Sequence, residues 1–205
     1  MTLRLAAALA MVVGVVGLLG FLHLLGKGPF ASFEQRHLRA MKDRLDAPAR
    51  VTPVTTADFA ALPHRRPVAE YSALEAHGVS MEGYVQHVVP SIDGDIHLEI
   101  VPLPPHAEGY QPYYVTAEIT PQWRRGSRTW RFEPLIATFR PPRSGRTAWD
   151  GGPKRVRISG WQLYDYQYDN TPSSRFPRLT GWEIHPVTRI EIWDEPRAAY
   201  VEYAR

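Results

Sequence analysis

Apolar and polar residues alternate along five segments in the second half of the chain, a pattern that predicts β-strands. In the second segment, Ile96, Leu98 and Ile100 fall on one face and polar residues on the other. The Asp-Gly pair within residues 92–95 predicts a tight turn between the first two strands. The predicted strands are residues 79–89, 95–103, 113–120, 154–166 and 182–193.

Residues 129–139 predict one helix between the third and fourth strands. The resulting order of strand, strand, strand, helix, strand, strand resembles the OB-fold, a small Greek-key barrel. We therefore expect a mainly β fold, a five-stranded OB-like Greek-key barrel with one inserted helix, at residues 70–195. OB-folds bind oligonucleotides, oligosaccharides or proteins and a few are enzymes, so the fold class alone selects no function.

The N-terminal part has a different pattern, because residues 5–26 are uncharged and mostly apolar. As a helix this run would extend roughly 33 Å, enough for a hydrocarbon core of about 30 Å. It predicts an uncleaved signal anchor, a transmembrane helix within residues 1–28, with a cleaved signal peptide as the alternative. Residues 29–69 then form a juxtamembrane helix and linker, and residues 196–205 a C-terminal tail.

This anchor sets the expected location of the protein. We expect the bacterial inner membrane, with the domain facing the periplasm or the exterior. Secretion after signal cleavage and a domain facing the cytoplasm remain open, since basic residues lie on both sides of the apolar run.

The composition excludes several kinds of functional site. The chain has no cysteine, which excludes disulfides, thiolate metal sites and a cysteine nucleophile. There is no glycine-rich phosphate loop, no G-x-S-x-G and no H-E-x-x-H motif. The net charge of +3 conceals a basic segment, residues 124–157, with ten Lys or Arg residues against two acidic ones. Such a segment attracts phosphates or anionic lipid, or is simply a solvated face.

Strand phase places several acidic and histidine side chains on the polar faces of neighbouring strands. Two histidines with carboxylates would suit Zn, Mn or Fe. A ligand-binding patch, or a polar network that holds the strands together, explains the same pattern. Pro186 interrupts the last strand and predicts a bulge or an unpaired position there. The candidate ligand or metal residues are Asp95, His97, Glu118, Asp165, Glu183 and His185.

Four short segments carry a more specific resemblance: GDIHL (94–98), AEI (117–119), SGWQLYD (159–165) and WEIHPVTRIEI (182–192). In this order they resemble an uncharacterised family of exported bacterial proteins with the pattern D-x-H-L, Glu, G-x-x-x-x-D, E-x-H-P. That family often has a His after the fourth-strand Asp, where this chain has Tyr166, Gln167 and Tyr168. The resemblance therefore implies a layout and no particular reaction. Residues 88–100 also resemble the start of staphylococcal-type nucleases, with Asp93 and Asp95 matching their D-G-D turn.

Aromatic residues gather in and after the fourth strand. They predict a surface on which bases or sugars stack, or else ordinary core packing. The candidate stacking residues are Trp161, Tyr164, Tyr166 and Tyr168.

Together these features favour a membrane-anchored binding or scaffold module of the cell envelope over an enzyme, with an envelope protein or polysaccharide as partner. The first alternative is a metal-dependent hydrolase of phosphodiesters or glycans that uses the His and carboxylate patch, with a divalent metal as the one candidate cofactor. The second is single-stranded nucleic-acid binding, which fits poorly with export.

Overall fold

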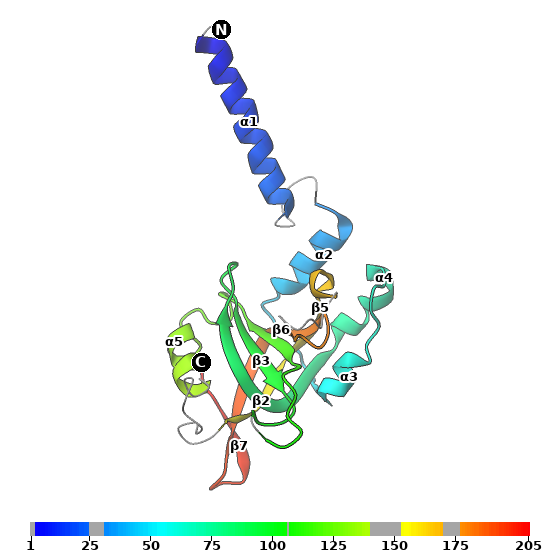
Figure 1. Cartoon of the computed structure of the whole chain (residues 1–205), viewed down its shortest axis with the longest axis vertical. Coiled ribbons are helices and arrows are strands. Elements are labelled where there is room, and N and C mark those ends of the chain that lie inside the picture. The colour runs from blue at the N-terminus through cyan, green and yellow to red at the C-terminus, as the bar shows by residue number, and fades with distance from the viewer. Residues whose placement is uncertain (1–2, 25–30, 106, 140–152, 170–176) are drawn as a thin grey trace. The chain divides into compact units, whose positions relative to one another are not determined.

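The computed structural model describes residues 3–24, 31–105, 107–139, 153–169 and 177–205 (Figure 1). The chain divides into two units, residues 1–41 and residues 42–205. The first unit contains helix α1 (Leu3–Leu24) and all but the last residue of helix α2 (Phe33–Lys42). Ser32 and Gln35 cap α2 reciprocally, because the Ser32 N–H donates to Gln35 Oε1 at 2.8 Å and the Gln35 N–H donates to Ser32 Oγ at 3.1 Å.

The prediction of a transmembrane signal anchor at residues 1–28 is wrong. Within the described part of the chain, no helix has both the length and the apolarity needed to cross a membrane. The predicted location in the bacterial inner membrane depended on this anchor and is therefore also wrong.

The second unit is β-rich and is built on one mixed sheet of seven strands, counted over the described residues. Its α-helices are short, and two single 3₁₀ turns, Leu74–Ala76 and Tyr166–Tyr168, accompany them. The helices are α3 (Thr56–Ala60), α4 (Val68–Tyr71) and α5 (Phe132–Phe139). The strands are β1 (Thr52–Val54), β2 (Gly78–Pro90), β3 (Ile96–Val101), β4 (Val115–Ile119), β5 (Arg155–Tyr164), β6 (Trp182–Asp194) and β7 (Ala199–Glu202).

Five of the strands pair in a closed ring in the order β2-β3-β4-β6-β5, with β5 pairing back to β2. All pairs in the ring are antiparallel except β4 with β6. Strand β1 adds to β2 in parallel, and β7 forms a hairpin with β6. Residues 199–202, which the sequence assigned to a tail, are thus part of the sheet.

The prediction of a five-stranded OB-like barrel with a single inserted helix and a transmembrane helix is therefore wrong. The fold has a mixed seven-stranded sheet and five α-helices among its described residues. The sequence missed β1 and β7 because strands of three and four residues are too short to display a period of two. Strand β1 also contains Pro53, which only an edge strand tolerates.

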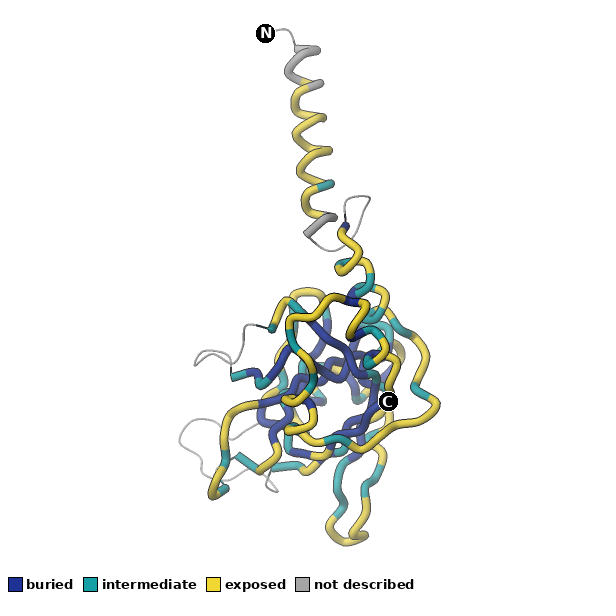
Figure 2. The backbone as a smooth tube through the Cα atoms, turned by 90° about the vertical axis from the view of Figure 1, so that its right-hand side faces the viewer, coloured by how far each residue is buried: buried dark blue, intermediate teal, exposed yellow. Residues whose placement is uncertain are grey.

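The five predicted ring strands are present, and their apolar faces form the core. Met81, Leu98 and Ile158, from three different strands, have no exposed surface. Figure 2 shows the buried residues gathered in the interior of this unit, with exposed residues around them. The inserted helix α5 is held near the C-terminus, since Trp130 Nε1 donates to the Tyr203 carbonyl oxygen at 3.0 Å.

The predicted interruption at Pro186 is confirmed. The β5–β6 register shifts between Ser159 and Gly160 and again before Gln162, so neither His185 nor Pro186 has a Cα partner on β5. Gly160 makes this possible, because a Cβ there would lie 2.3 Å from the Pro186 carbonyl oxygen. The absence of a side chain at Gly160 therefore lets β6 approach β5 directly beside His185.

We expect Gly160→Ala to destabilise the protein by about 1–3 kcal/mol, because the added methyl group forces the two strand backbones apart. Urea unfolding followed by tryptophan fluorescence measures the change. Gly17→Ala is the matched control, since nothing lies within 4 Å of the added Cβ. Equal stability of the two variants would contradict the close approach of β5 and β6.

Candidate functional site

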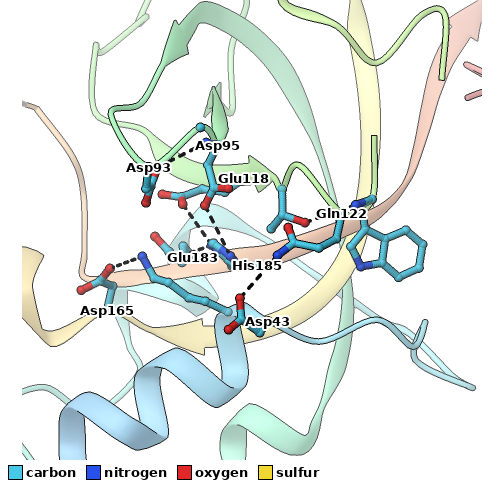
Figure 3. Close-up of polar contacts among 12 residues, drawn as sticks. Asp43, Asp93, Asp95, Glu118, Gln122, Asp165, Glu183 and His185 are labelled. Atoms are coloured by element: carbon cyan, nitrogen blue, oxygen red, sulfur yellow. Dashed lines mark hydrogen bonds and ion pairs between the residues drawn. The ribbon is translucent and has the colours of Figure 1, made fainter. Parts of the chain in front are cut away.

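Strands β3, β4 and β6 and the loop before β3 bring five of the predicted polar residues to one place. His97 on β3 lies directly opposite Glu118 on β4. Strand β4 pairs in parallel with β6 through Ala117 and Ile184, which sets Glu118 beside the neighbours of Ile184. Figure 3 shows the side chains of Asp95, Glu118 and Glu183 gathered around His185.

His185 is the centre of this group, which we call the His185 cluster: Asp95, Glu118, Glu183 and His185. Its Nδ1 lies 3.0 Å from Oε2 of Glu118 and 3.2 Å from Oε1 of Glu183. Its Nε2 faces the other way, 3.8 Å from Oδ2 of Asp95. All four residues are buried, which the assignment of these residues to polar strand faces did not predict. Burial strengthens the attraction within these ion pairs, because charges interact more strongly in a low-dielectric interior than on a surface.

The loop of residues 91–95 fixes Asp95. Gly94 has φ +93°, which confirms the turn predicted from the Asp-Gly pair. The Asp95 N–H donates to Oδ1 of Asp93 at 3.2 Å, and the Asp95 carbonyl oxygen accepts from the Ser91 N–H at 2.9 Å. A guanidinium N–H of Arg124 donates to the Gly94 carbonyl oxygen at 2.7 Å. The main chain of Asp95 is thus held through both its N–H and its carbonyl oxygen.

Two cations that the sequence analysis missed flank the cluster. Arg178 is buried and donates to Oε2 of Glu183, and its guanidinium stacks 4.2 Å from the ring centroid of Tyr168. Lys42 Nζ lies 2.7 Å from Oδ2 of Asp165, whose carboxylate is fully buried. No local pattern marks either residue, since each meets its carboxylate only after the chain has folded.

The pKa shifts show which charges the cluster stabilises. Burial alone would lower the pKa of His185, but its contacts with Glu118 and Glu183 outweigh burial and raise that pKa to about 10. Burial likewise opposes ionisation of Glu118, yet His185 holds its pKa well below the ordinary value. Burial raises the pKa of Asp95 to about 6, an effect that His185 only partly offsets.

The nearby cations respond to the same carboxylates. Burial would lower the pKa of Lys42, but the charges of Glu183, Glu118 and Asp165 raise it above its ordinary value. For Arg178, burial is outweighed chiefly by Glu183, and its pKa is raised too. The cluster therefore has a strongly negative potential that draws cations.

Several buried atoms of the cluster lie at ion-pair distance from one another and meet no hydrogen-bond criterion among the described residues. They are both carboxylate oxygens of Glu118, both ring nitrogens of His185, and Oε1 of Glu183. Buried polar atoms of this kind can accommodate an additional partner such as an ion or water.

The same atoms suit a metal ion. Asp95, Glu118 and His185 each offer one ligand atom, and these atoms all lie within 4.8 Å of one another. His97 is close by, with Nε2 3.2 Å from Oε1 of Glu118. One imidazole with two carboxylates is a donor set for zinc, manganese or iron.

Of the six predicted residues, five come together and one stands apart. Asp95, His97, Glu118, Glu183 and His185 belong to or touch the His185 cluster. Asp165 instead binds Lys42, and its Oδ1 accepts from the Gln167 N–H at 3.1 Å, which caps the turn after β5.

The four aromatic residues predicted to stack do not form one surface. Tyr164 is buried in the core beside Tyr71 and Trp182. The indole of Trp161 lies under Arg44 and donates to the Asp46 carbonyl oxygen at 2.8 Å. Tyr166 packs partly against the core, and Tyr168 lies under Arg178.

The basic segment 124–157 is described except for residues 140–152, so three of its arginines lie outside the described residues. Two of those described are paired with carboxylates. Arg157 binds Glu191 through two hydrogen bonds of 2.8 Å, and Arg155 donates to Glu82 at 2.6 Å.

We expect Arg178→Met to lower the free energy of unfolding by about 3–5 kcal/mol, because the buried carboxylate of Glu183 loses its guanidinium partner at Oε2 and keeps only His185 at Oε1. Chemical denaturation monitored by circular dichroism measures this. Adding Glu183→Gln to the same chain should recover part of the loss. Arg66→Met, in an exposed pair with Glu70, is the control and should cost less than about 1 kcal/mol. A similar loss in both single variants would argue against a buried pair.

Comparisons with known proteins give limited information. No protein-family model and no curated protein matches the chain. Among solved structures, an OBody, AM3L09, bound to hen egg-white lysozyme is similar over 65% of this chain and 98% of its own, with 18% identity and a TM-score of 0.34. The aspartyl-tRNA synthetase of Entamoeba histolytica is similar over 79% of this chain and 28% of its own, with 16% identity and a TM-score of 0.31.

Proposed function

We propose that this protein is a binding module that takes one divalent transition-metal ion at Asp95, Glu118 and His185. One observation carries the proposal: an imidazole and two carboxylates converge, with their donor atoms within 4.8 Å of one another. Buried atoms of Glu118 and His185 have no hydrogen-bond partner in the described part of the chain. A cation would satisfy them together.

The orientation of His185 supports the assignment. Its Nε2 faces Asp95, and its Nδ1 faces Glu118 and Glu183. Metal-binding histidines commonly present one nitrogen to the metal while the other donates to a carboxylate that fixes the ring. Glu183, itself held by Arg178, fits the role of the orienting carboxylate. His97 lies beside Glu118 and outside the three-residue ligand set.

The balance between nearby negative and positive side chains determines the expected affinity for the metal ion. The carboxylates of the His185 cluster attract a divalent ion, whereas Lys42 and Arg178 repel it. In the metal-free protein these side chains, together with the imidazolium of His185, provide the compensating positive charge. Metal affinity should therefore depend on the nearby cations as well as on the ligands.

We expect the chelator-treated full chain to bind one equivalent of Zn²⁺ or Mn²⁺, measured by calorimetry and elemental analysis, with a rise in melting temperature because the ion binds only the folded state. Asp95→Asn should lower the affinity at least roughly tenfold through loss of a charged ligand. Lys42→Met should raise it through loss of repulsion.

The control is His87→Asn, since His87 is exposed and pairs with Glu99, apart from the His185 cluster. It should bind metal as the unmodified chain does. Absence of stoichiometric binding, together with a melting temperature unaffected by either metal, would leave the site as a structural ion-pair network.

A second candidate function, metal-assisted hydrolysis of phosphodiesters or glycans, is favoured by the three-residue ligand set. Three protein ligands leave coordination positions open, and a metal there would supply an activated water. The residues present would hold the ion and orient His185. If this function is correct, the metal-loaded chain releases p-nitrophenol from bis(p-nitrophenyl) phosphate or a p-nitrophenyl glycoside, and Asp95→Asn abolishes the release. Equal release by the two proteins would assign it to a contaminant.

A further inference from the structure

Three arginines line a pocket outside the His185 cluster, which we call the arginine pocket. It lies between the segment after β4 and the start of α5 and has a volume of about 450 Å³. Its residues are Pro121, Arg124, Arg125, Gly126, Arg131, Phe132 and Glu133.

The arginine pocket carries an excess of positive charge, with three guanidinium groups against the single carboxylate of Glu133. Concave surfaces lined by one sign of charge concentrate the field and attract counter-ions. Guanidinium groups bind phosphate oxygens through paired N–H donors, a geometry that ammonium groups lack. The chemistry of the lining therefore selects an oxyanion.

Backbone contacts hold two of these arginines in place and leave donors available. Arg124 uses one terminal nitrogen on the Gly94 carbonyl oxygen at 2.7 Å, and Arg131 uses Nε on the Ser127 carbonyl oxygen at 2.9 Å. The Nε of Arg124 is buried and has no hydrogen-bond partner among the described residues. Arginines that are already ordered lose less side-chain entropy when they bind a ligand.

The size and lining of the pocket indicate a ligand larger than a free inorganic ion. A volume of about 450 Å³ lies within the usual range for small-molecule sites, roughly 300–1,000 Å³. Pro121 and Phe132 provide apolar surface beside the arginines. A ligand that fits carries an anionic group at one end and a ring or apolar part at the other.

We propose that the arginine pocket binds a phosphorylated small molecule, with the phosphate on Arg125, Arg131 and Arg124 and the remainder against Pro121 and Phe132. This site is separate from the proposed metal site and does not depend on it. The two are linked structurally, because Arg124 also holds the loop that positions Asp95. Arg124 is accordingly left intact in the test below.

The test measures binding of AMP, glucose 6-phosphate and inorganic phosphate to the full chain in low salt, by calorimetry and by NMR shifts of arginine side chains. Adenosine and glucose are the unphosphorylated references. We expect the phosphorylated compounds to bind more tightly than inorganic phosphate, and the references not to bind. Arg125→Gln and Arg131→Gln should each weaken binding roughly tenfold, since each removes charge-assisted hydrogen bonds.

Arg128→Gln is the matched control, because Arg128 is exposed in the same segment but does not line the pocket. It should leave the affinity unchanged. An equal loss in all three variants would indicate non-specific attraction and overturn the proposal, as would no binding of any phosphorylated compound. Binding confined to a single-stranded oligonucleotide, or to vesicles containing phosphatidylglycerol, would overturn the small-molecule class.

Discussion

The ion-pair contacts of His185 with Glu118 and Glu183 are the interaction on which the site depends. Three ionisable groups are buried where β4 and β6 meet, an environment that would exclude any one of them alone. They are tolerated because each compensates the others, and because Arg178 compensates Glu183 from outside. Breaking one contact leaves an uncompensated charge, which is far more costly than losing the pair as a whole.

The pairing and register of the strands make these contacts possible. The parallel pairing of β4 with β6 closes the ring and brings Glu118 beside the Glu183–His185 segment. The irregular register at Pro186, which Gly160 permits, leaves His185 and Pro186 without Cα partners on β5. The loop of Asp95 and the arginine pocket share Arg124, so the two polar regions of the molecule are mechanically connected.

Strand phase predicted the composition of the candidate site well and its environment poorly. Strand phase assigned Glu118 and His185 to the faces opposite their apolar neighbours, since alternation along a strand is a local property, whereas Asp95 lies in the loop before β3. Their burial was not predicted, because covering groups such as Lys42 and Arg178 approach from segments with no recognisable pattern. The membrane anchor and the five-stranded barrel were wrong, because each rested on reading one local pattern as a whole architecture.

The sequence by itself determined which residues face the core, where the chain turns at Gly94 and where β6 is interrupted. These features depend on side-chain period, backbone freedom and the missing N–H of proline, all of which act within a few residues. Only the tertiary structure decided that the sheet has seven strands, that the ring closes, and that His185 lies between two carboxylates and faces a third. Strand pairing and charge compensation join residues far apart in the chain, so no local pattern can specify them.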